Sequence, residues 1–206
     1  MLSRGLQTTS RSATAAGRRH LAVAAPRAVV NGDHGEAATA PTRYMPETAL
    51  GRYYVEQKNE HWRSAVAAQS FQKGAVIGSA PGELFKTPNR WTIQLEADKH
   101  LEFHGGLEFV NHSCAPNTKI LVSETAEEIA FVATRDIEEG ASLHLSFDYT
   151  TSEWDMDEKF DCLCGAPNCR HHIGGAKYLS DKEVEARIGM FTPSVLRQLL
   201  DKKIAQ

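Results

Sequence analysis

The sequence predicts a mainly β domain that ends in short helices. Several short segments alternate apolar and polar residues with a period of two, and Gly or Pro residues break the chain between them. After residue 178, two helix-capping patterns indicate short terminal helices. With 206 residues, the chain is long enough for one domain with a hydrophobic core, flanked by tails.

The first predicted strands lie between residues 64 and 80. Residues 64–71 (SAVAAQSF) and 75–78 (AVIG) are largely apolar and are separated by a polar turn at residues 72–74. Pro81 and Gly82 follow and are typical of a chain break. We therefore expect two short strands joined by a turn.

Three further segments predict strands. Residues 91–95 (WTIQL) alternate as in a strand with one buried face, and residues 128–137 (EIAFVATRDI) form a largely apolar run before a turn at residues 139–140. Residues 141–147 (ASLHLSF) have the clearest period of two. Their apolar face would carry Leu143, Leu145 and Phe147.

The C-terminal tail predicts two short helices. Ser180 and Glu183 have the spacing of a capping box, in which each residue satisfies a free backbone N–H group of the other. Thr192 and Pro193 are a typical helix start. The apolar residues of this second helix would be Val195, Leu196, Leu199 and Leu200.

The N-terminal 42 residues differ from the rest in composition. Residues 1–31 contain five arginines and no acidic residue, and Arg4, Arg11 and Arg18 are spaced by seven. A segment rich in Arg and Ser is typical of an organelle transit peptide, for a mitochondrion or a plastid. A disordered basic leader explains the same composition and is compatible with the nucleus or the cytoplasm. A small-residue linker at residues 35–42 follows, and we expect order to begin near Tyr44.

Charge and hydropathy indicate which classes of partner the chain can bind. Beyond the leader, 18 basic residues stand against 26 acidic ones, which favours a basic peptide over the phosphate backbone of a nucleic acid. No run of about 18 apolar residues exists that would cross a bilayer. We expect neither direct nucleic-acid binding nor membrane insertion.

The cysteines indicate a metal site. The chain contains four: Cys114, Cys162, Cys164 and Cys169. Cys162 and Cys164 are too close along a strand to form a disulfide readily, so a closed tetrahedral zinc site is the better interpretation. The three clustered cysteines need a fourth ligand. Cys114 is our choice, with His171 and His172 as competitors.

Cys114 belongs to an unusual segment, residues 109–117 (FVNHSCAPN). The amide of Asn111 and the ring of His112 suit a polar ligand with a heteroaromatic part. An ordinary turn rich in Asn and Ser between two strands is the alternative interpretation.

This segment resembles the N-H-S-C-x-P-N signature of SET-domain protein lysine methyltransferases. Residues 133–149 (ATRDIEEGASLHLSFDY) resemble the second signature of that family, which ends in an essential tyrosine. The C-x-C-x4-C pattern is similar to its zinc-binding post-SET segment, and residues 67–83 are similar to its opening. The resemblance covers residues 60 to about 175.

The resemblance implies a domain organisation. After the leader and linker at residues 1–42 come a SET domain (43–150), a post-SET zinc segment (151–177) and a helical tail (178–206). In the family the C-terminal segment threads beneath a loop in a knot-like arrangement. That threading would bring Cys114 to Cys162, Cys164 and Cys169, which together hold zinc.

The resemblance also implies a reaction, methyl transfer from S-adenosylmethionine to a lysine of a protein or peptide, histone or non-histone. Tyr149 would be the catalytic residue and would line the lysine channel with Phe147, a position where Phe rather than Tyr leaves room for higher methylation states. The residues that would hold the cofactor are Asn111, His112, Trp62 and Arg63.

The sequence departs from the family pattern at three places. Trp62, Arg63 and Ser64 stand where the family has G-x-G, and Ala141 and Ser142 replace acidic residues. Ahead of the first signature, Glu108 and Phe109 replace the Asn and Arg often found there. These changes bear on cofactor affinity. They leave open an alternative, a catalytically inactive SET-like module that binds lysine-containing peptides.

Overall fold

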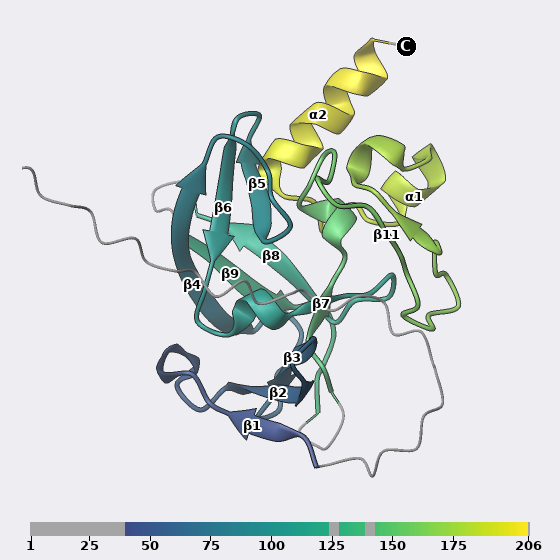
Figure 1. Cartoon of the computed structure of the whole chain (residues 1–206). Helices are drawn as coiled ribbons and strands as arrows, with labels where there is room; N and C mark the ends of the chain where they lie inside the picture. The colour runs from purple at the N-terminus through teal and green to yellow at the C-terminus, as the bar shows by residue number, and fades with distance from the viewer. Residues whose placement is uncertain (1–39, 124–127, 139–142, 206) are drawn as a thin grey trace, which may run out of the picture.

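The structure is a computed structural model that describes residues 40–123, 128–138 and 143–205 (Figure 1). Nearly all of the predicted leader lies outside these residues. The same holds for the predicted turn at residues 139–140 and for the first two residues of the predicted strand 141–147. No helix in the described part of the chain is long and apolar enough to cross a membrane.

Two antiparallel sheets form the body of the domain, as the prediction of a mainly β fold requires. The smaller sheet contains β1 (Thr42–Tyr44), β2 (Tyr53–Asn59) and β3 (Trp62–Ala67). The larger has the order β5-β6-β4-β9-β8, with β5 (Thr92–Glu96), β6 (Lys99–Phe103), β4 (Val76–Phe85), β9 (Glu128–Ala133) and β8 (Thr118–Val122). Side chains from both sheets share one core, which includes Tyr53, Ile77, Leu101 and Phe131.

Strand β4 corrects the prediction that Pro81 and Gly82 end a strand. The strand continues to Phe85 but changes its partner, because residues 76–81 pair with β9 and residues 82–85 pair with β6. Pro81 has no N–H group to continue the first ladder. A Cβ atom at Gly82 would lie 2.1 Å from the carbonyl oxygen of Glu102, so only glycine allows β6 to approach this closely.

Strand β5 is confirmed, but its predicted exposed face is wrong. Both faces are covered, since Thr92 and Gln94 are 7% and 5% exposed. The cover comes from the C-terminal part of the chain, where the backbone N–H of Trp154 and the amide of Gln198 both donate to Gln94 Oε1. Alternation within the strand could not reveal a cover supplied by residues 60 and 104 positions away.

The predicted strand at residues 141–147 is reduced to β10 (Ser146–Phe147), with an isolated bridge between His144 and Val66. The alternation itself is confirmed, because Leu145 and Phe147 are buried. The ladder is interrupted because the backbone N–H of Ser146 donates to the side chain of Asn117 at 2.8 Å rather than to a neighbouring strand.

The C-terminal part packs beside the sheets and carries both predicted helices (Figure 1). A hairpin of β11 (Phe160–Asp161) and β12 (His172–Ile173) precedes α1 (Asp181–Glu185) and α2 (Pro193–Ile204). The capping box of α1 is confirmed. In α2, Val195 and Leu199 are buried whereas Leu196 and Leu200 are exposed, so only one edge of the predicted apolar face is covered. The knot-like threading stays a prediction.

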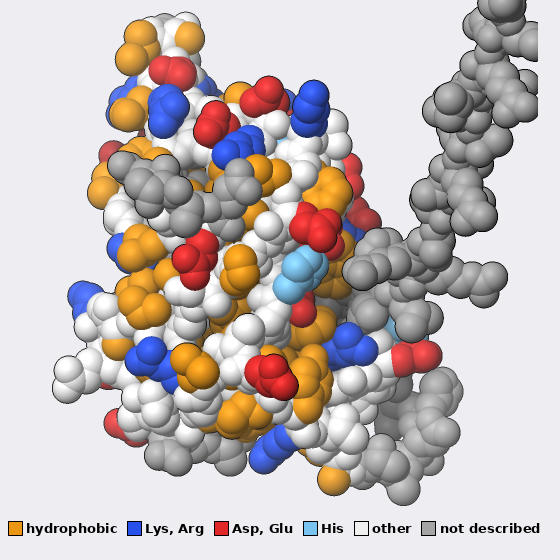
Figure 2. Space-filling view, turned by 90° about the vertical axis from the view of Figure 1, so that its left-hand side faces the viewer, with side chains coloured by type: hydrophobic (Ala, Val, Ile, Leu, Met, Phe, Trp, Pro, Cys, Tyr) orange, Lys and Arg blue, Asp and Glu red, His pale blue; other side chains and the backbone are white. Residues whose placement is uncertain are grey.

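The surface on the β4 side mixes side chains of all kinds. Figure 2 shows hydrophobic groups interspersed with acidic and basic ones over this face. Among the described residues seen there, the basic side chains stand singly rather than in a continuous stripe.

Candidate active site

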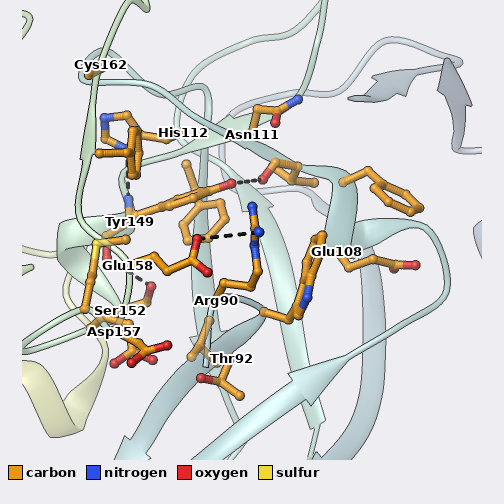
Figure 3. Close-up of a pocket in the computed structure, with 18 of the residues that line it drawn as sticks. Arg90, Thr92, Glu108, Asn111, His112, Tyr149, Ser152, Asp157, Glu158 and Cys162 are labelled. Carbon is orange, nitrogen blue, oxygen red and sulfur yellow. Dashed lines mark hydrogen bonds and ion pairs between the residues drawn. The ribbon is translucent and has the colours of Figure 1, made fainter. Parts of the chain in front are cut away.

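A cavity of about 810 Å³ opens between β3, the start of β5 and the C-terminal segment (Figure 3). Short one-turn 3-10 helices shape its wall, η2 (Leu107–Phe109) before β7 (Asn111–His112) and η3 (Tyr149–Thr151) after β10. The structure brings all the residues predicted to hold cofactor and lysine to this cavity: Trp62, Arg63, Asn111, His112, Phe147 and Tyr149.

Strand pairing explains why the two signatures meet. β7 and β10 are parallel neighbours, so that Asn111 lies opposite Ser146 and His112 lies opposite Phe147. The amide of Asn111 donates to the backbone carbonyl of Arg63 at 2.9 Å. The first signature is therefore joined to the second and also to the start of β3.

Tyr149 is fixed at both ends. Its hydroxyl donates to the carbonyl of Val110 at 3.1 Å, and its backbone N–H donates to Nδ1 of His112 at 3.2 Å. Its ring packs against Phe147, with ring centres 4.6 Å apart. Burial raises the pKa of Tyr149, so its phenol remains protonated and can donate a hydrogen bond at neutral pH.

His112 lies between the cavity and the cysteines. Burial lowers its pKa to about 4, against the opposing effect of Asp148, so the ring is neutral at neutral pH. Because Nδ1 accepts from Tyr149, the ring proton belongs on Nε2. That atom lies 3.3 Å from Sγ of Cys114.

Trp62, Arg63 and Ser64 stand where the family pattern has G-x-G, and Arg63 places a cation at the cavity wall. The Trp62 ring packs against Lys58 and His144. The guanidinium of Arg63 lies over Phe109, and its buried Nε has no hydrogen-bond partner among the residues that the structure describes. A buried donor without a partner is costly unless a ligand completes it.

Glu108 lines the same wall. Burial raises the pKa of Glu108, although the carboxylate accepts a hydrogen bond of 2.7 Å from the backbone N–H of Gly106. In the sequence, Glu108 stands out only as a departure from the family pattern.

The opposite wall of the cavity was not predicted from the sequence. It is supplied by Arg90 and Trp91 on one side and by residues 152–153 and 156–164 on the other. Arg90 and Glu158 lie 3.5 Å apart across the cavity (Figure 3). A usable signal was present, because residues 153–161 (EWDMDEKFD) combine five acidic residues with two aromatic ones.

The four cysteines form one cluster. Their Sγ atoms all lie within 4.8 Å of one another, and those of Cys114 and Cys162 are 4.0 Å apart. Zinc with four bonds of about 2.3 Å places its sulfur ligands about 3.8 Å apart, so this spacing is compatible with zinc. In the described part of the chain His171 and His172 do not join the cluster.

The thiols differ in acidity. Burial raises the pKa of Cys114 to about 11 and also raises that of Cys162. Burial acts in the same direction on Cys164, but hydrogen bonds from backbone groups and from the other thiols outweigh it and lower the pKa to about 7. Cys164 therefore forms a thiolate readily. A cation bound in the cluster would favour ionisation of the other three thiols.

The arrangement defines a class of protein, a small β-rich domain that joins a neutral histidine and a buried tyrosine in one cavity beside a tetracysteine cluster. The sequence model of the SET domain matches residues 34–150. The chain belongs to the SET-domain family, as the two signatures predicted.

Several relatives are named methyltransferases. The chain is 33% identical over 120 residues to a "Histone-lysine N-methyltransferase, H3 lysine-4 specific" of Emericella nidulans and 35% identical over 130 residues to one of Saccharomyces cerevisiae. These matches cover 56% and 61% of this chain but only 9% and 11% of those proteins. The "Methyltransferase flvH" of Aspergillus flavus is 30% identical over 138 residues, which cover 66% of this chain and 75% of that protein.

Proposed function

We propose that this protein transfers a methyl group from S-adenosylmethionine to a lysine side chain of a protein or peptide. The observation that carries the proposal is the meeting of Asn111, His112 and Tyr149 in one cavity of about 810 Å³. Membership of the SET-domain family supports the same reaction.

The wall near β3 fits the cofactor. Arg63 offers a cationic group with an unpaired buried N–H, which suits the carboxylate of an amino-acid moiety. Asn111, His112 and Trp62 offer an amide, a neutral imidazole and an aromatic face for the remaining polar and heteroaromatic parts. When bound, S-adenosylmethionine supplies an electrophilic methyl group.

The aromatic part of the cavity fits the lysine. Phe147, Tyr149 and Phe160 line it, and the ring centre of Tyr149 lies 4.6 Å from that of Phe147 and 6.0 Å from that of Phe160. An apolar wall penalises the ammonium form of lysine and favours the neutral amine that attacks. The reaction is a displacement along one line, so alignment and exclusion of water are the protein's main contributions.

Tyr149 is the residue that aligns the amine. Its phenol stays protonated, and Val110 holds the hydroxyl in place through a backbone carbonyl. The hydroxyl oxygen keeps an acceptor lone pair for the amine, and the carbonyl of Val110 offers a second acceptor. No acid–base pair is required beyond loss of the lysine proton to solvent.

The charge of the cavity suits a basic peptide. Acidic side chains outnumber basic ones around it, with Glu108, Glu153, Asp157, Glu158 and Asp161 against Arg63, Arg90 and Lys159. Basic residues beside the target lysine would gain from this excess at low ionic strength. The substrate is therefore a lysine in a basic segment, whether of a histone or of another protein.

A structural zinc ion is part of the proposal. Cys114, Cys162, Cys164 and Cys169 would bind it as thiolates, and the Nε2–H of His112 would donate to the thiolate of Cys114. The metal would hold the C-terminal segment against the first signature and so close the cavity.

Calorimetric titration of S-adenosylmethionine into the zinc-loaded protein is the first test. We expect a dissociation constant in the micromolar range, about −8 kcal/mol. Tyr149→Phe should bind the cofactor equally well but lower turnover on a lysine-rich peptide by roughly a hundredfold or more. Tyr54→Phe is the matched control, because it removes a tyrosine hydroxyl from β2 outside the cavity lining.

Two results would contradict the proposal. Full turnover in Tyr149→Phe would exclude the role of this hydroxyl. A folded, zinc-loaded protein that does not bind the cofactor but does bind lysine-rich peptides would favour the inactive module, which the replaced glycines at Trp62 and Ser64 suggest.

A further inference from the structure

The C-terminal tail contacts the turn that carries Tyr149. Arg187, in the segment between α1 and α2, is 6% exposed and donates from Nε to Oδ2 of Asp148 at 2.7 Å. Asp148 directly precedes Tyr149 and is 1% exposed. The pair joins residues 39 positions apart, and Arg187 lies outside the residues that the family model matches.

Asp148 in turn holds the shape of η3. Its Oδ1 accepts from the backbone N–H and the hydroxyl of Thr150, at 3.1 and 2.7 Å, as an N-cap residue does. One carboxylate therefore uses one oxygen to shape the turn of Tyr149 and the other to bind Arg187. A buried carboxylate is costly without a partner, so the turn in this form depends on the guanidinium.

Arg187 is itself held on both sides. Its Nη1 donates to the carbonyl of Glu183 in α1 at 3.0 Å, so the guanidinium bridges α1 and the turn. Farther along the tail, the backbone N–H of Thr192 donates to the carbonyl of Thr151 at the end of η3. The turn of Tyr149 is thus attached to the tail at its N-cap residue, Asp148, and at its last residue, Thr151.

We propose that Arg187 is a positioning residue for Tyr149 and that the helical tail completes the active site. The inference rests on the proposed function, because it concerns the same reaction. The planar guanidinium can hold Asp148 and the carbonyl of Glu183 at once, which a lysine ammonium does less well. Alignment of the tyrosine hydroxyl depends on the turn, and misplacement by about 1 Å costs roughly a hundredfold in rate.

The test compares Arg187→Gln and Arg187→Lys with Arg197→Gln in the full-length, zinc-loaded chain. Arg197 is an exposed arginine on α2 of the same tail and is the matched control. We expect Arg187→Gln to lower kcat at least about tenfold while the KM for S-adenosylmethionine changes less than about threefold. Arg187→Lys should give an intermediate kcat, and Arg197→Gln should equal the wild type.

Amide hydrogen exchange supplies a readout that does not need activity. Arg187→Gln should speed exchange at residues 149–152, whose N–H groups are bonded within the turn and to His112, and Arg197→Gln should not. If the wild type shows no turnover but exchange at residues 149–152 is faster in Arg187→Gln, the role of Arg187 in holding the turn is supported while the proposed function is contradicted, so the two failures are distinguishable.

Wild-type kcat in Arg187→Gln, an equal loss in Arg197→Gln, or a lowered kcat with unchanged exchange at residues 149–152 would each overturn the proposal. If Arg187→Gln does not fold, Arg187→Lys tests the proposal instead, because it retains a positive charge beside the buried carboxylate of Asp148. Its kcat should then be at least about threefold below the wild type, and a wild-type kcat would overturn the proposal.

Discussion

At the scale of single residues, His112 connects the cavity with the cysteine cluster through its two ring nitrogens. Nδ1 accepts from the backbone of Tyr149, and Nε2 lies 3.3 Å from Sγ of Cys114. The sequence predicted a cofactor role for His112 from its signature. It could not predict the partner of Nδ1, because Tyr149 is 37 positions away.

Phe147 offers a test at this scale. Its ring is 5% exposed and packs between Phe131 and Tyr149, with ring centres at 5.5 and 4.6 Å. Phe147→Tyr adds a hydroxyl to this wall, which occupies space and can bind a water molecule where methyl groups would lie. We expect the wild type to give di- and trimethylated lysine and the variant to give mainly monomethylated lysine.

Mass spectrometry of a lysine-rich peptide after complete reaction measures the product distribution. The rate of the first methyl transfer should fall less than about threefold, because the target amine and the methyl group keep their positions. An unchanged product distribution in Phe147→Tyr would show that this wall does not limit the methylation state.

At the scale of elements, Gly82 is required for the change of partners in β4. A Cβ atom there would meet a backbone oxygen, which cannot move aside as the end of a flexible side chain can. Gly82→Ala should therefore lower the free energy of unfolding by about 2–3 kcal/mol through overpacking. Ser79→Ala, at an exposed position of the same strand, should change it by less than about 0.5 kcal/mol.

Urea unfolding of both variants, with the metal kept saturating, measures the two values. A Gly82→Ala protein as stable as Ser79→Ala would mean that β4 and β6 separate at no cost, contrary to the close approach seen here. Such a result would favour the prediction from the sequence alone, in which Gly82 ends a strand.

The same strand shows what local patterns can predict. Alternation and turn residues identified segments in β3, β4, β5, β9 and β10, and the capping box identified α1. Three of the errors share one cause, because partner exchange in β4, the covered face of β5 and the shortened β10 all depend on residues far along the chain. A period of two describes one strand and contains no information on what lies against it.

At the scale of the whole molecule, the two signatures and the cysteine spacing predicted which residues meet at the cavity. The second wall and Arg187 were not predicted. Arg187 stands in an ordinary helical tail, and its partner Asp148 is a motif residue whose signature gives no sign of a cation. A buried ion pair has no local sequence pattern, so only the fold reveals it.

Metal removal tests the molecule as a whole. Cys114 and Cys162 are 48 positions apart, so the proposed zinc ion, bound to both, would close a long loop and would hold the C-terminal segment against the sheets. By analogy with a disulfide across a loop of this length, the linkage stabilises the fold by up to about 4 kcal/mol, and binding of metal to unfolded cysteines reduces that value. We expect a strong chelator to lower Tm by about 5–10 °C.

The chelator should also weaken binding of S-adenosylmethionine at least about tenfold, because residues 160–164 line the cavity and Cys162 and Cys164 belong to the cluster. Cys169→Ser is the matched variant. It removes one ligand, so its Tm should lie near that of the chelated wild type and should respond little to chelator. Elemental analysis should find one zinc ion per wild-type chain. A metal-free wild type with full thermal stability would contradict both the ligand set and the linkage that it would provide between the first signature and the C-terminal segment.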